Sequence, residues 1–269
     1  MQNKADEYRR DGKRIGFVPT MGYLHQGHTS LMRVAKSNAD IVVTSIYVNP
    51  TQFGPNEDLA SYPRDLEHDK EQAYANGTDI LFVPDDSEMY QNPLTTVHVK
   101  EITAGLCGAS RPWHFDGVTT VVTKLFNIVK PHVAVFGQKD AQQAIVVEKM
   151  ARDLSMDVRI IVAPIVREAD GLAMSSRNKY LNGDERRQAL VLFQSLQLAA
   201  RLFEQGERDT DRIRNAMRQV IQTAPDARID YIEIVNKNLT PVTELSGNTL
   251  IALAVYIGKT RLIDNLLLP

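Results

Sequence analysis

Short apolar runs alternate with helical patterns through the first two-thirds of the chain, and this alternation constrains the fold more than any other feature. The clearest strand pattern lies at residues 41–48, where β-branched residues dominate. The clearest helical pattern puts five apolar residues on one face: Val118, Val121, Val122, Leu125 and Ile128. The other predicted strands are residues 14–18, 80–83, 133–136 and 158–162, and the other predicted helices are residues 28–36, 65–76 and 141–154. Strands that alternate with helices predict a mostly parallel sheet covered by helices on both faces.

The pattern changes near residues 170 and 171. A long amphipathic helix is predicted at residues 183–206 and a second helix at 210–223, and strand-like stretches follow at 229–235, 241–243 and 249–257. Helices followed by strands are typical of a small α+β domain. The sequence thus predicts an α/β chain, with a Rossmann-like parallel-sheet domain over residues 1–170 and a smaller α+β domain over residues 171–269.

The charge and cysteine content exclude several classes of function. Lys and Arg total 31 and Asp and Glu total 33, which gives a net charge of −2. Because a general grip on nucleic acid needs a basic surplus, that function is not expected. The single cysteine, Cys107, excludes an internal disulfide and fits a reducing compartment. The charged N-terminus is no secretory signal, and the longest apolar runs are too short to span a bilayer. We therefore expect a cytoplasmic protein that binds neither nucleic acid nor a membrane.

The loop after the first predicted strand, PTMGYLHQGH, combines two glycines with two histidines and leads into a helix. Glycines let the backbone approach a ligand closely, and a helix N-terminus favours anions. His25 and His28 are three residues apart, so both could face one phosphate chain. Two other interpretations stay open: a surface loop without a ligand, or a metal-binding pair, although no nearby Cys or acidic residue completes a metal site.

Three further loops belong to the same predicted rim, because ligands bind beyond the carboxyl ends of the strands in an open parallel sheet. NPTQFG follows the second strand, and GQKD follows residues 133–136, where Lys139 could reach phosphate. Val166 and the stretch DGLAMSSR follow residues 158–162, and this stretch offers two hydroxyls and an arginine. Each loop also has a simpler interpretation, a solvated lysine or an ordinary helix cap. Four loops with anion-binding groups at one rim favour a phosphate-containing ligand.

The segments PTMGYLHQGH, NPTQFG, FGQKDAQQ and VREADGLAMSSRN together resemble the pantothenate synthetase (pantoate–β-alanine ligase) family, and the resemblance continues to the GKTRLIDN stretch. The HxGH motif in the first segment is typical of a wider nucleotidyltransferase superfamily. The resemblance implies ATP-dependent condensation of (R)-pantoate with β-alanine to pantothenate through a pantoyl-adenylate, with release of AMP and pyrophosphate. It also implies Mg²⁺ held largely by the phosphate oxygens of ATP with no metal ligand assigned to the protein, a C-terminal lid domain, and a homodimer.

The resemblance assigns roles to residues by their place in the motifs. His28 is implied as the catalytic histidine, and Gln52 and Gln143 as the pantoate-binding residues, with Gln52 also lining the β-alanine position. The residues implied to bind ATP are Met21, Gly22, Tyr23, Leu24, His25, Gln26, Gly27, His28, Gly137, Gln138, Lys139, Asp140, Val166, Met174, Ser175, Ser176 and Arg177. Among these, Val166 is implied to contact adenine through its backbone, and Gln138 stands where the family usually has Glu.

Two competing functions are compatible with the HxGH motif. A cytidylyltransferase of the same superfamily would transfer a nucleotide to a phosphorylated small molecule, but NPTQFG and FGQKDAQQ argue against it. A catalytically silent nucleotide-binding or scaffold protein would tolerate loss of the histidine, lysine and arginine set, and all of these residues are present.

Overall fold

The computed structural model describes residues 1–55 and 57–269. The chain forms two compact units, each of which is discontinuous in sequence. The first unit comprises Met1–Lys100, Arg111–Gln138 and Val146–Pro164, and the second comprises Glu101–Ser110, Lys139–Ile145 and Ile165–Pro269. The domain boundary expected between residues 170 and 171 stays a prediction.

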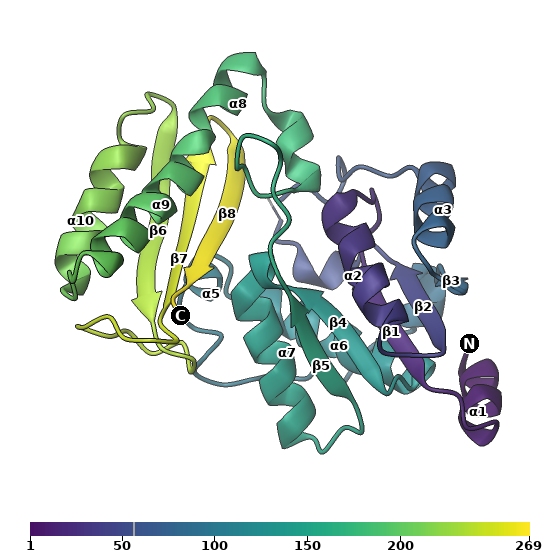
Figure 1. The fold of residues 1–269 in the computed structure, drawn as a ribbon. Coiled ribbons are helices and arrows are strands. Elements are labelled where there is room, and N and C mark those ends of the chain that lie inside the picture. The colour runs from purple at the N-terminus through teal and green to yellow at the C-terminus, as the bar shows by residue number, and fades with distance from the viewer. Residues whose placement is uncertain (56) are drawn as a thin grey trace. The chain divides into compact units, whose positions relative to one another are not determined.

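A five-stranded parallel sheet is the centre of the first unit, as the alternation of strands and helices predicts (Figure 1). Its strand order is β3-β2-β1-β4-β5. The strands are β1 (Ile15–Thr20), β2 (Ile41–Ile46), β3 (Ile80–Phe82), β4 (Val133–Gly137) and β5 (Arg159–Ala163). The chain moves outward from β1 through β2 to β3, then returns to place β4 on the other side of β1. The topological switch point therefore lies between β1 and β4, where ligands bind in open α/β sheets.

Both faces of the sheet are buried, and successive side chains of a strand pack on opposite faces. Val18 packs in one apolar cluster with Met32 of α2, whereas the ring of Phe17 lies 6.3 Å from that of Phe126 in α6. The helices that belong to the first unit are α1 (Gln2–Arg10), α2 (Gln26–Lys36), α3 (Leu66–Ala75), α4 (Asp86–Met89) and α6 (His114–Val129). A 3₁₀ turn, η1 (Pro50–Gln52), follows β2, and most of α7 (Ala141–Asp153) also belongs to this unit.

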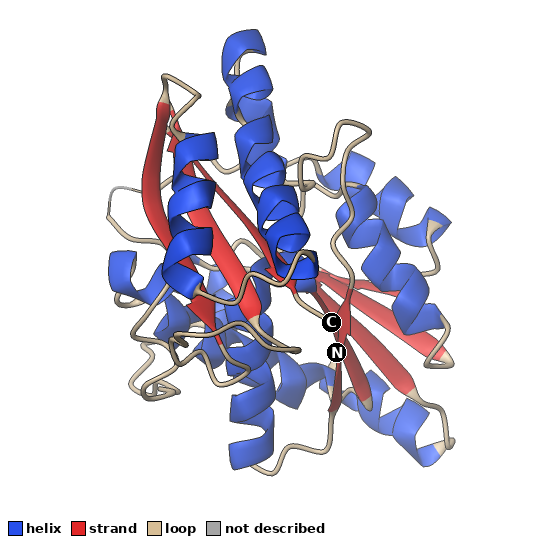
Figure 2. Cartoon of the chain, turned by 60° about the vertical axis from the view of Figure 1, so that its left-hand side comes forward, coloured by secondary structure: helices blue, strands red, loops and turns tan. Residues whose placement is uncertain are grey.

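The second unit is built on a three-stranded antiparallel sheet in the order β6-β7-β8 (Figure 2). Its strands are β6 (Ala227–Val235), β7 (Leu250–Ile257) and β8 (Thr260–Leu267). The two long helices α9 (Leu190–Glu204) and α10 (Thr210–Ile221) pack on this sheet around a shared apolar core. The unit also contains α5 (Cys107–Ser110), α8 (Gly183–Gln188) and the 3₁₀ helix η3 (Ser176–Tyr180), and the 3₁₀ turn η2 (Gln138–Asp140) leads into it. Among the described residues, no helix is long and apolar enough to cross a membrane.

Two local predictions in the second unit were wrong, and one strand was missed. The single helix expected at residues 183–206 is divided at Ala189, where a 3.3 Å bond from the Leu192 N–H to the Ala189 carbonyl marks a tight 3₁₀-type turn. The strand expected at residues 241–243 is only an isolated bridge from Val235 to Pro241, because proline has no N–H to continue a ladder. The third strand is instead β8, which pairs with β7 across a two-residue turn at Gly258 and Lys259.

Candidate active site

Three loops of the first unit meet at the carboxyl edge of its parallel sheet. Met21 directly follows β1, Gln52 closes the η1 turn after β2, and Gly137 ends β4. Because β1, β2 and β4 are parallel and β1 pairs with both neighbours, these positions share one edge. A Cβ atom on Gly137 would lie 4.0 Å from Leu31 of α2, so the end of β4 lies close to the helix that carries the two histidines. The structure therefore brings Met21, Gln52 and Gly137 to one edge of the sheet, beside the switch point.

The backbone of the first loop is fixed by a buried carboxylate from α3. Asp69, which is 1% exposed, accepts hydrogen bonds from the N–H groups of Tyr23 (2.8 Å) and Leu24 (2.6 Å). Gly22 has a φ of +83°, and a Cβ there would lie 2.8 Å from the Asp69 carboxylate and 3.0 Å from Ile46, so only glycine fits. The amides of residues 23 and 24 are thus used inside the protein, and the Leu24 side chain belongs to the core.

His25 and His28 hold one another in place by hydrogen bonds at the start of α2. His25 is the N-cap residue, and its Nδ1 accepts from the N–H of Gly27 at 3.1 Å. The N–H of His25 donates in turn to Nδ1 of His28 at 3.3 Å, and the two ring centroids are 4.0 Å apart. In a neutral imidazole, an Nδ1 atom that accepts leaves the proton on Nε2. Both histidines therefore carry their proton on Nε2, at a helix N-terminus that favours anions.

Gln52 is held at both its side chain and its backbone. Its Oε1 accepts from Nδ2 of Asn49 at 3.1 Å, and its Nε2 donates to the sulfur of Met21 at 3.3 Å. Its carbonyl oxygen accepts from Arg111 at 3.2 Å and from Nδ1 of His114 at 2.9 Å. Since a carbonyl only accepts, His114 must carry its proton on Nδ1. The amide of Gln52 is therefore a buried, oriented group next to the first loop.

Helix α6 approaches the Gln52 turn so closely that only glycine fits at the contact. A Cβ atom on Gly117 would lie 2.4 Å from the carbonyl oxygen of Thr51 and 2.6 Å from the nitrogen of Gln52. The Gly117 carbonyl accepts from Nδ2 of Asn49 at 3.2 Å. Helix and turn are thus joined by direct backbone contact.

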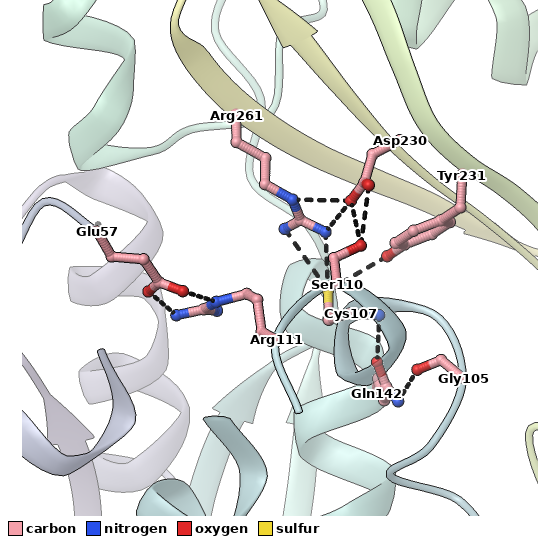
Figure 3. A network of polar contacts seen from close by, with 9 residues as sticks. All are labelled: Glu57, Gly105, Cys107, Ser110, Arg111, Gln142, Asp230, Tyr231 and Arg261. Atoms are coloured by element: carbon pink, nitrogen blue, oxygen red, sulfur yellow. Dashed lines mark hydrogen bonds and ion pairs between the residues drawn. The ribbon is translucent and has the colours of Figure 1, made fainter. Parts of the chain in front are cut away.

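Arg111 joins this turn to a carboxylate (Figure 3). Its guanidinium donates to both oxygens of Glu57, at 2.7 and 2.5 Å, in addition to the Gln52 carbonyl. Burial opposes ionisation of Glu57, but the hydrogen bond and charge of Arg111 outweigh it, and the pKa of the carboxyl lies below its usual value. Glu57 and Arg111 therefore form an ion pair at neutral pH.

The second unit carries the fourth loop and the residues that follow β4. Lys139 and Asp140 lie in η2, with 3.7 Å between the ammonium and the carboxylate. Gln143 follows in the first turn of α7 and is half-buried, and its amide makes no hydrogen bond to the described part of the chain. The adjacent Gln142 is buried and fully used: its Oε1 accepts from the Cys107 N–H at 3.0 Å. Of the two neighbouring glutamines, Gln143 is thus the one with an amide available to a ligand.

Residues 166–177 form a short hairpin that ends in η3. The Val166 carbonyl accepts from the N–H of Met174 at 3.0 Å, and Arg167 forms a bridge with Ala173. Ser175 is the N-cap of η3, and its hydroxyl accepts from the Arg177 N–H at 3.3 Å. Ser175 therefore does serve as a helix cap, one of the simpler interpretations of this stretch. Ser176 is buried immediately after it.

A partly buried polar cluster in the second unit anchors the segment 101–110 (Figure 3). Arg261 of β8 pairs with Asp230 of β6 at 2.7 Å and lies 3.6 Å from the sulfur of Cys107. The Tyr231 hydroxyl is 3.3 Å from the same sulfur, and Ser110 donates to Asp230 at 2.8 Å. Burial raises the pKa of Tyr231, which keeps its phenol neutral. The cluster fixes Cys107 and Ser110 against the antiparallel sheet.

Several residues that hold the site were not identified from the sequence. Asp69, Arg111 and His114 each lie more than 40 positions from the loop residue that they bind, and none belongs to a recognisable motif. A carboxylate or arginine within an amphipathic helix or a loop looks like an ordinary surface residue. No local signal distinguishes them, because Asp69 lies in the charged stretch LEHDKEQ and Arg111 and His114 lie in a mixed polar and aromatic stretch. Among residues 1–55 and 57–269, no group of three or more His, Cys, Asp and Glu side chains is arranged to hold a metal ion.

Comparison with known proteins identifies a single family. A family model described as pantoate-beta-alanine ligase matches residues 1–267. A pantothenate synthetase from Caldicellulosiruptor saccharolyticus is 55% identical over 99% of this chain and 95% of its own length. One from Pelotomaculum thermopropionicum is 58% identical over 97% of this chain and 94% of its own length.

Solved structures agree with these sequence matches. The crystal structure of pantothenate synthetase from Thermus thermophilus has a TM-score of 0.94 and 42% identity, and the match covers 98% of both chains. A pantoate-beta-alanine ligase from Francisella tularensis, complexed with beta-gamma ATP and beta-alanine, has a TM-score of 0.81 and 36% identity over 98% of this chain and 95% of its own.

Proposed function

The chain belongs to the pantoate-beta-alanine ligase family, and we propose that it condenses (R)-pantoate with β-alanine to form pantothenate, using ATP. It is an ATP-dependent ligase that forms an amide bond. The observation that best supports this function is that the loop which carries the His25–His28 cap also contacts the oriented amide of Gln52, through Met21, at the carboxyl edge of the sheet. Imidazole donors suit phosphate, and a neutral amide suits the hydroxyls and carboxylate of pantoate.

The first chemical step in the proposal is attack of the pantoate carboxylate on the α-phosphorus of ATP, with pyrophosphate as the leaving group. A carboxylate needs no general base, so the protein contributes position and charge stabilisation. His28 is the catalytic residue in this assignment, and its Nε2–H donates to the reacting phosphate while Nδ1 holds the His25 backbone. The amine of β-alanine then attacks the carbonyl of pantoyl-adenylate and releases AMP.

The remaining substrate contacts are assigned on residue chemistry. Lys139 and Arg177 supply positive charge to the triphosphate, and Ser175, Ser176 and backbone groups supply hydrogen-bond donors. Gln143 is assigned to pantoate together with Gln52, because its half-buried amide has no partner in the described chain. The other residues assigned to ATP are Met21, Gly22, Tyr23, Leu24, Gln26, Gly27, Gly137, Gln138, Asp140, Val166 and Met174.

Tyr23 and Leu24 are assigned to ATP, but their backbone N–H groups are already used inside the protein. Their N–H groups donate to Asp69. Any contact of these two residues with ATP must therefore use other atoms, such as the carbonyl oxygens.

Mg²⁺ is proposed to accompany ATP. Magnesium keeps several waters and is commonly bound through substrate phosphates with one or two carboxylates. Asp140 is a carboxylate of the ATP segment that fits this chemistry, and the phosphate oxygens would provide most of the ligands. Exchange activity measured at fixed ATP should disappear with excess chelator and return with added Mg²⁺.

Pyrophosphate exchange tests the reaction and separates its substrates. With pantoate present and β-alanine absent, labelled pyrophosphate should enter ATP, because adenylate formation precedes amide formation. Lys139→Ala should abolish this exchange at every pantoate concentration, whereas Gln143→Ala should raise the pantoate requirement and recover partly at saturation. A strict need for β-alanine would overturn the two-step route. Turnover of CTP with a phosphorylated alcohol would favour a cytidylyltransferase.

Substitution of His28 tests its donor role. His28→Ala should lower kcat for the exchange by about 10²–10³. His28→Asn keeps an acceptor near the position of Nδ1 and loses the distal N–H, so it should preserve the helix cap and still lose activity. A His28→Ala enzyme within a few-fold of wild type would exclude this role.

A homodimer and a cytoplasmic location complete the proposal. The near-neutral net charge of −2 does not oppose association, and light scattering should give about twice the chain mass. A concentration-independent monomer would exclude the dimer. The unpaired thiol of Cys107 fits a reducing compartment, and fractionation of the native host should place the enzyme with cytoplasmic proteins.

A further inference from the structure

The dipeptide Asp264–Asn265 of β8 reaches both ATP segments of the second unit. The Asp264 carboxylate accepts from Arg167 at 2.6 and 3.0 Å, and Arg167 also donates to the Gly171 carbonyl at 3.0 Å. Asn265 donates through Nδ2 to the carbonyl oxygen of Lys139 at 3.0 Å. One strand therefore holds the hairpin that leads to η3 and the backbone of the lysine assigned to the triphosphate.

Asn178, in η3, has an amide whose orientation is fixed. Its Nδ2 donates to Oε1 of Glu168 at 2.7 Å and to the carbonyl oxygen of Ala173 at 3.1 Å. Both partners only accept, so the amide cannot be reversed without placing oxygen against oxygen. Its Oδ1 atom is buried, and no donor in the described part of the chain bonds to it. A buried acceptor left without a donor is costly, by about 1–3 kcal/mol.

A cavity of about 10 Å³ lies beside Asn178, and the polar residues Lys139, Ser175 and Asp264 also line it. This volume is about the least that accommodates one water molecule, and a buried water needs two to four polar partners. Lys139 and Ser175 bring donors, whereas Asp264 and the Asn178 oxygen bring acceptors. A metal cation is disfavoured by the lysine, and an anion larger than water does not fit.

We propose that this cavity binds one water that accepts from the Lys139 ammonium and donates to Oδ1 of Asn178, which makes Asn178 and Asp264 positioning residues for Lys139 and η3. The inference rests on the proposed function, which assigns Lys139 and Arg177 to ATP. The water connects η2, which carries Lys139, to η3, which carries Arg177. These two segments therefore keep a fixed position relative to one another. Lys139 acts as pyrophosphate departs, so loss of the bridge should affect kcat rather than pantoate binding.

The direct test is a high-resolution crystal structure of the wild-type enzyme. The expected result is an ordered water within about 3.2 Å of Asn178 Oδ1, with a second contact to Lys139 or Asp264. A protein donor bonded directly to Asn178 Oδ1, or a closed cavity, would overturn the proposal. This measurement needs no variant, so it decides the question even where a substitution prevents folding.

The kinetic test compares Asn178→Leu with Glu168→Ala in pantoate-dependent pyrophosphate exchange. Asn178→Leu fills similar space and removes the acceptor, and should lower kcat by about 10- to 100-fold with the KM for pantoate within about twofold. Glu168→Ala breaks the bond to the Asn178 amide but leaves Oδ1 in place, so its kcat should stay within a few-fold of wild type.

The outcomes separate the inference from the function on which it rests. Equal losses of kcat in the two variants, or a lowered melting temperature with unchanged kcat in Asn178→Leu, would show a merely structural role and overturn the proposal. Wild-type enzyme that supports no exchange would instead overturn the proposed function, and the crystal structure would still decide the water.

Discussion

Two carboxylate–arginine pairs hold parts of the candidate site, and they differ in electrostatics although their geometry is alike. Arg111 binds both oxygens of Glu57 beside the Gln52 turn, and Arg167 binds both oxygens of Asp264 behind η3. The pKa of Glu57 is lowered, because Arg111 outweighs the effect of burial. The pKa of Asp264 is raised, because burial outweighs the favourable charges of Arg167 and Lys139.

The depth of burial explains the difference. The Glu57 side chain is 25% exposed, whereas that of Asp264 is 1% exposed. Removal of a carboxylate from water is a larger penalty in the deeper site, and a nearby guanidinium recovers only part of it. The Glu57 pair therefore resembles a partly solvated ion pair. The Asp264 pair chiefly fixes the position of Arg167, and removal of the Asp264 charge leaves the Arg167 guanidinium without its partner.

The largest expected effect comes from Asp264→Asn. It removes the charge that compensates Arg167 and should lower the free energy of unfolding by up to about 3 kcal/mol, less than for a fully enclosed pair because Arg167 is partly exposed. Urea denaturation at neutral pH measures this loss, with wild type as the reference. A loss below about 0.5 kcal/mol, the range of ordinary surface substitutions, would show that deep burial does not raise the cost of breaking this pair.

Lysine substitutions should separate the two pairs by substrate. Lysine cannot reproduce the several directed bonds of either guanidinium. Arg111→Lys should raise the KM for pantoate about 5- to 10-fold, because the Gln52 carbonyl loses a donor. Arg167→Lys should lower kcat of the exchange by a similar factor. Each change corresponds to the loss of about one hydrogen bond. Steady-state exchange kinetics at varied pantoate distinguish these results. The reverse assignment would contradict the roles given to the two segments.

Glu57→Gln should have a smaller effect on stability than Asp264→Asn. A partly exposed pair contributes about 0.5–1 kcal/mol, and the glutamine side chain can still accept one bond from Arg111. Urea denaturation under the same conditions gives the comparison. A loss equal to that of Asp264→Asn would mean that depth of burial does not distinguish the pairs.

The smallest effect is a difference in pH dependence. The folded pKa of Glu57 lies below its unfolded value of about 4.3, so its contribution to stability is present above that pH and is lost as the pH falls through the folded pKa. For Asp264 the folded pKa lies above about 3.9, so its contribution is present below that pH and is lost as the pH rises through the folded pKa.

The two variants should therefore depart from wild type in opposite directions on acidification. The stability gap between wild type and Glu57→Gln should narrow as the pH falls below about 4.3, and the gap for Asp264→Asn should widen as the pH falls toward about 3.9. Unfolding free energies across this range measure both gaps. Gaps that move in the same direction would contradict the assigned pKa shifts.

The sequence predicted the elements whose signal is local. Each strand of the parallel sheet is a compact apolar run between turn residues, so the patterns at residues 41–48 and 133–136 locate β2 and β4 within two residues. The Gly- and His-rich loop after β1 could also be recognised from the sequence, because the cap formed by His25 and His28 joins residues three apart. The strand β8 was missed, since polar residues interrupt its apolar pattern and only pairing with β7 makes it a strand.

What only the tertiary structure decided is how the site is held. Asp69 binds the first loop from 45 and 46 residues away, and Asn265 binds the Lys139 carbonyl across 126 residues. Neither contact leaves a periodic trace, because a hydrogen bond between distant residues depends on the path of the chain and not on local composition. The sequence by itself determined the parallel sheet and the chemical groups at its edge. Folding determined the tautomers, the buried carboxylates and the cavity beside Asn178, because only packing removes these groups from water and fixes their partners.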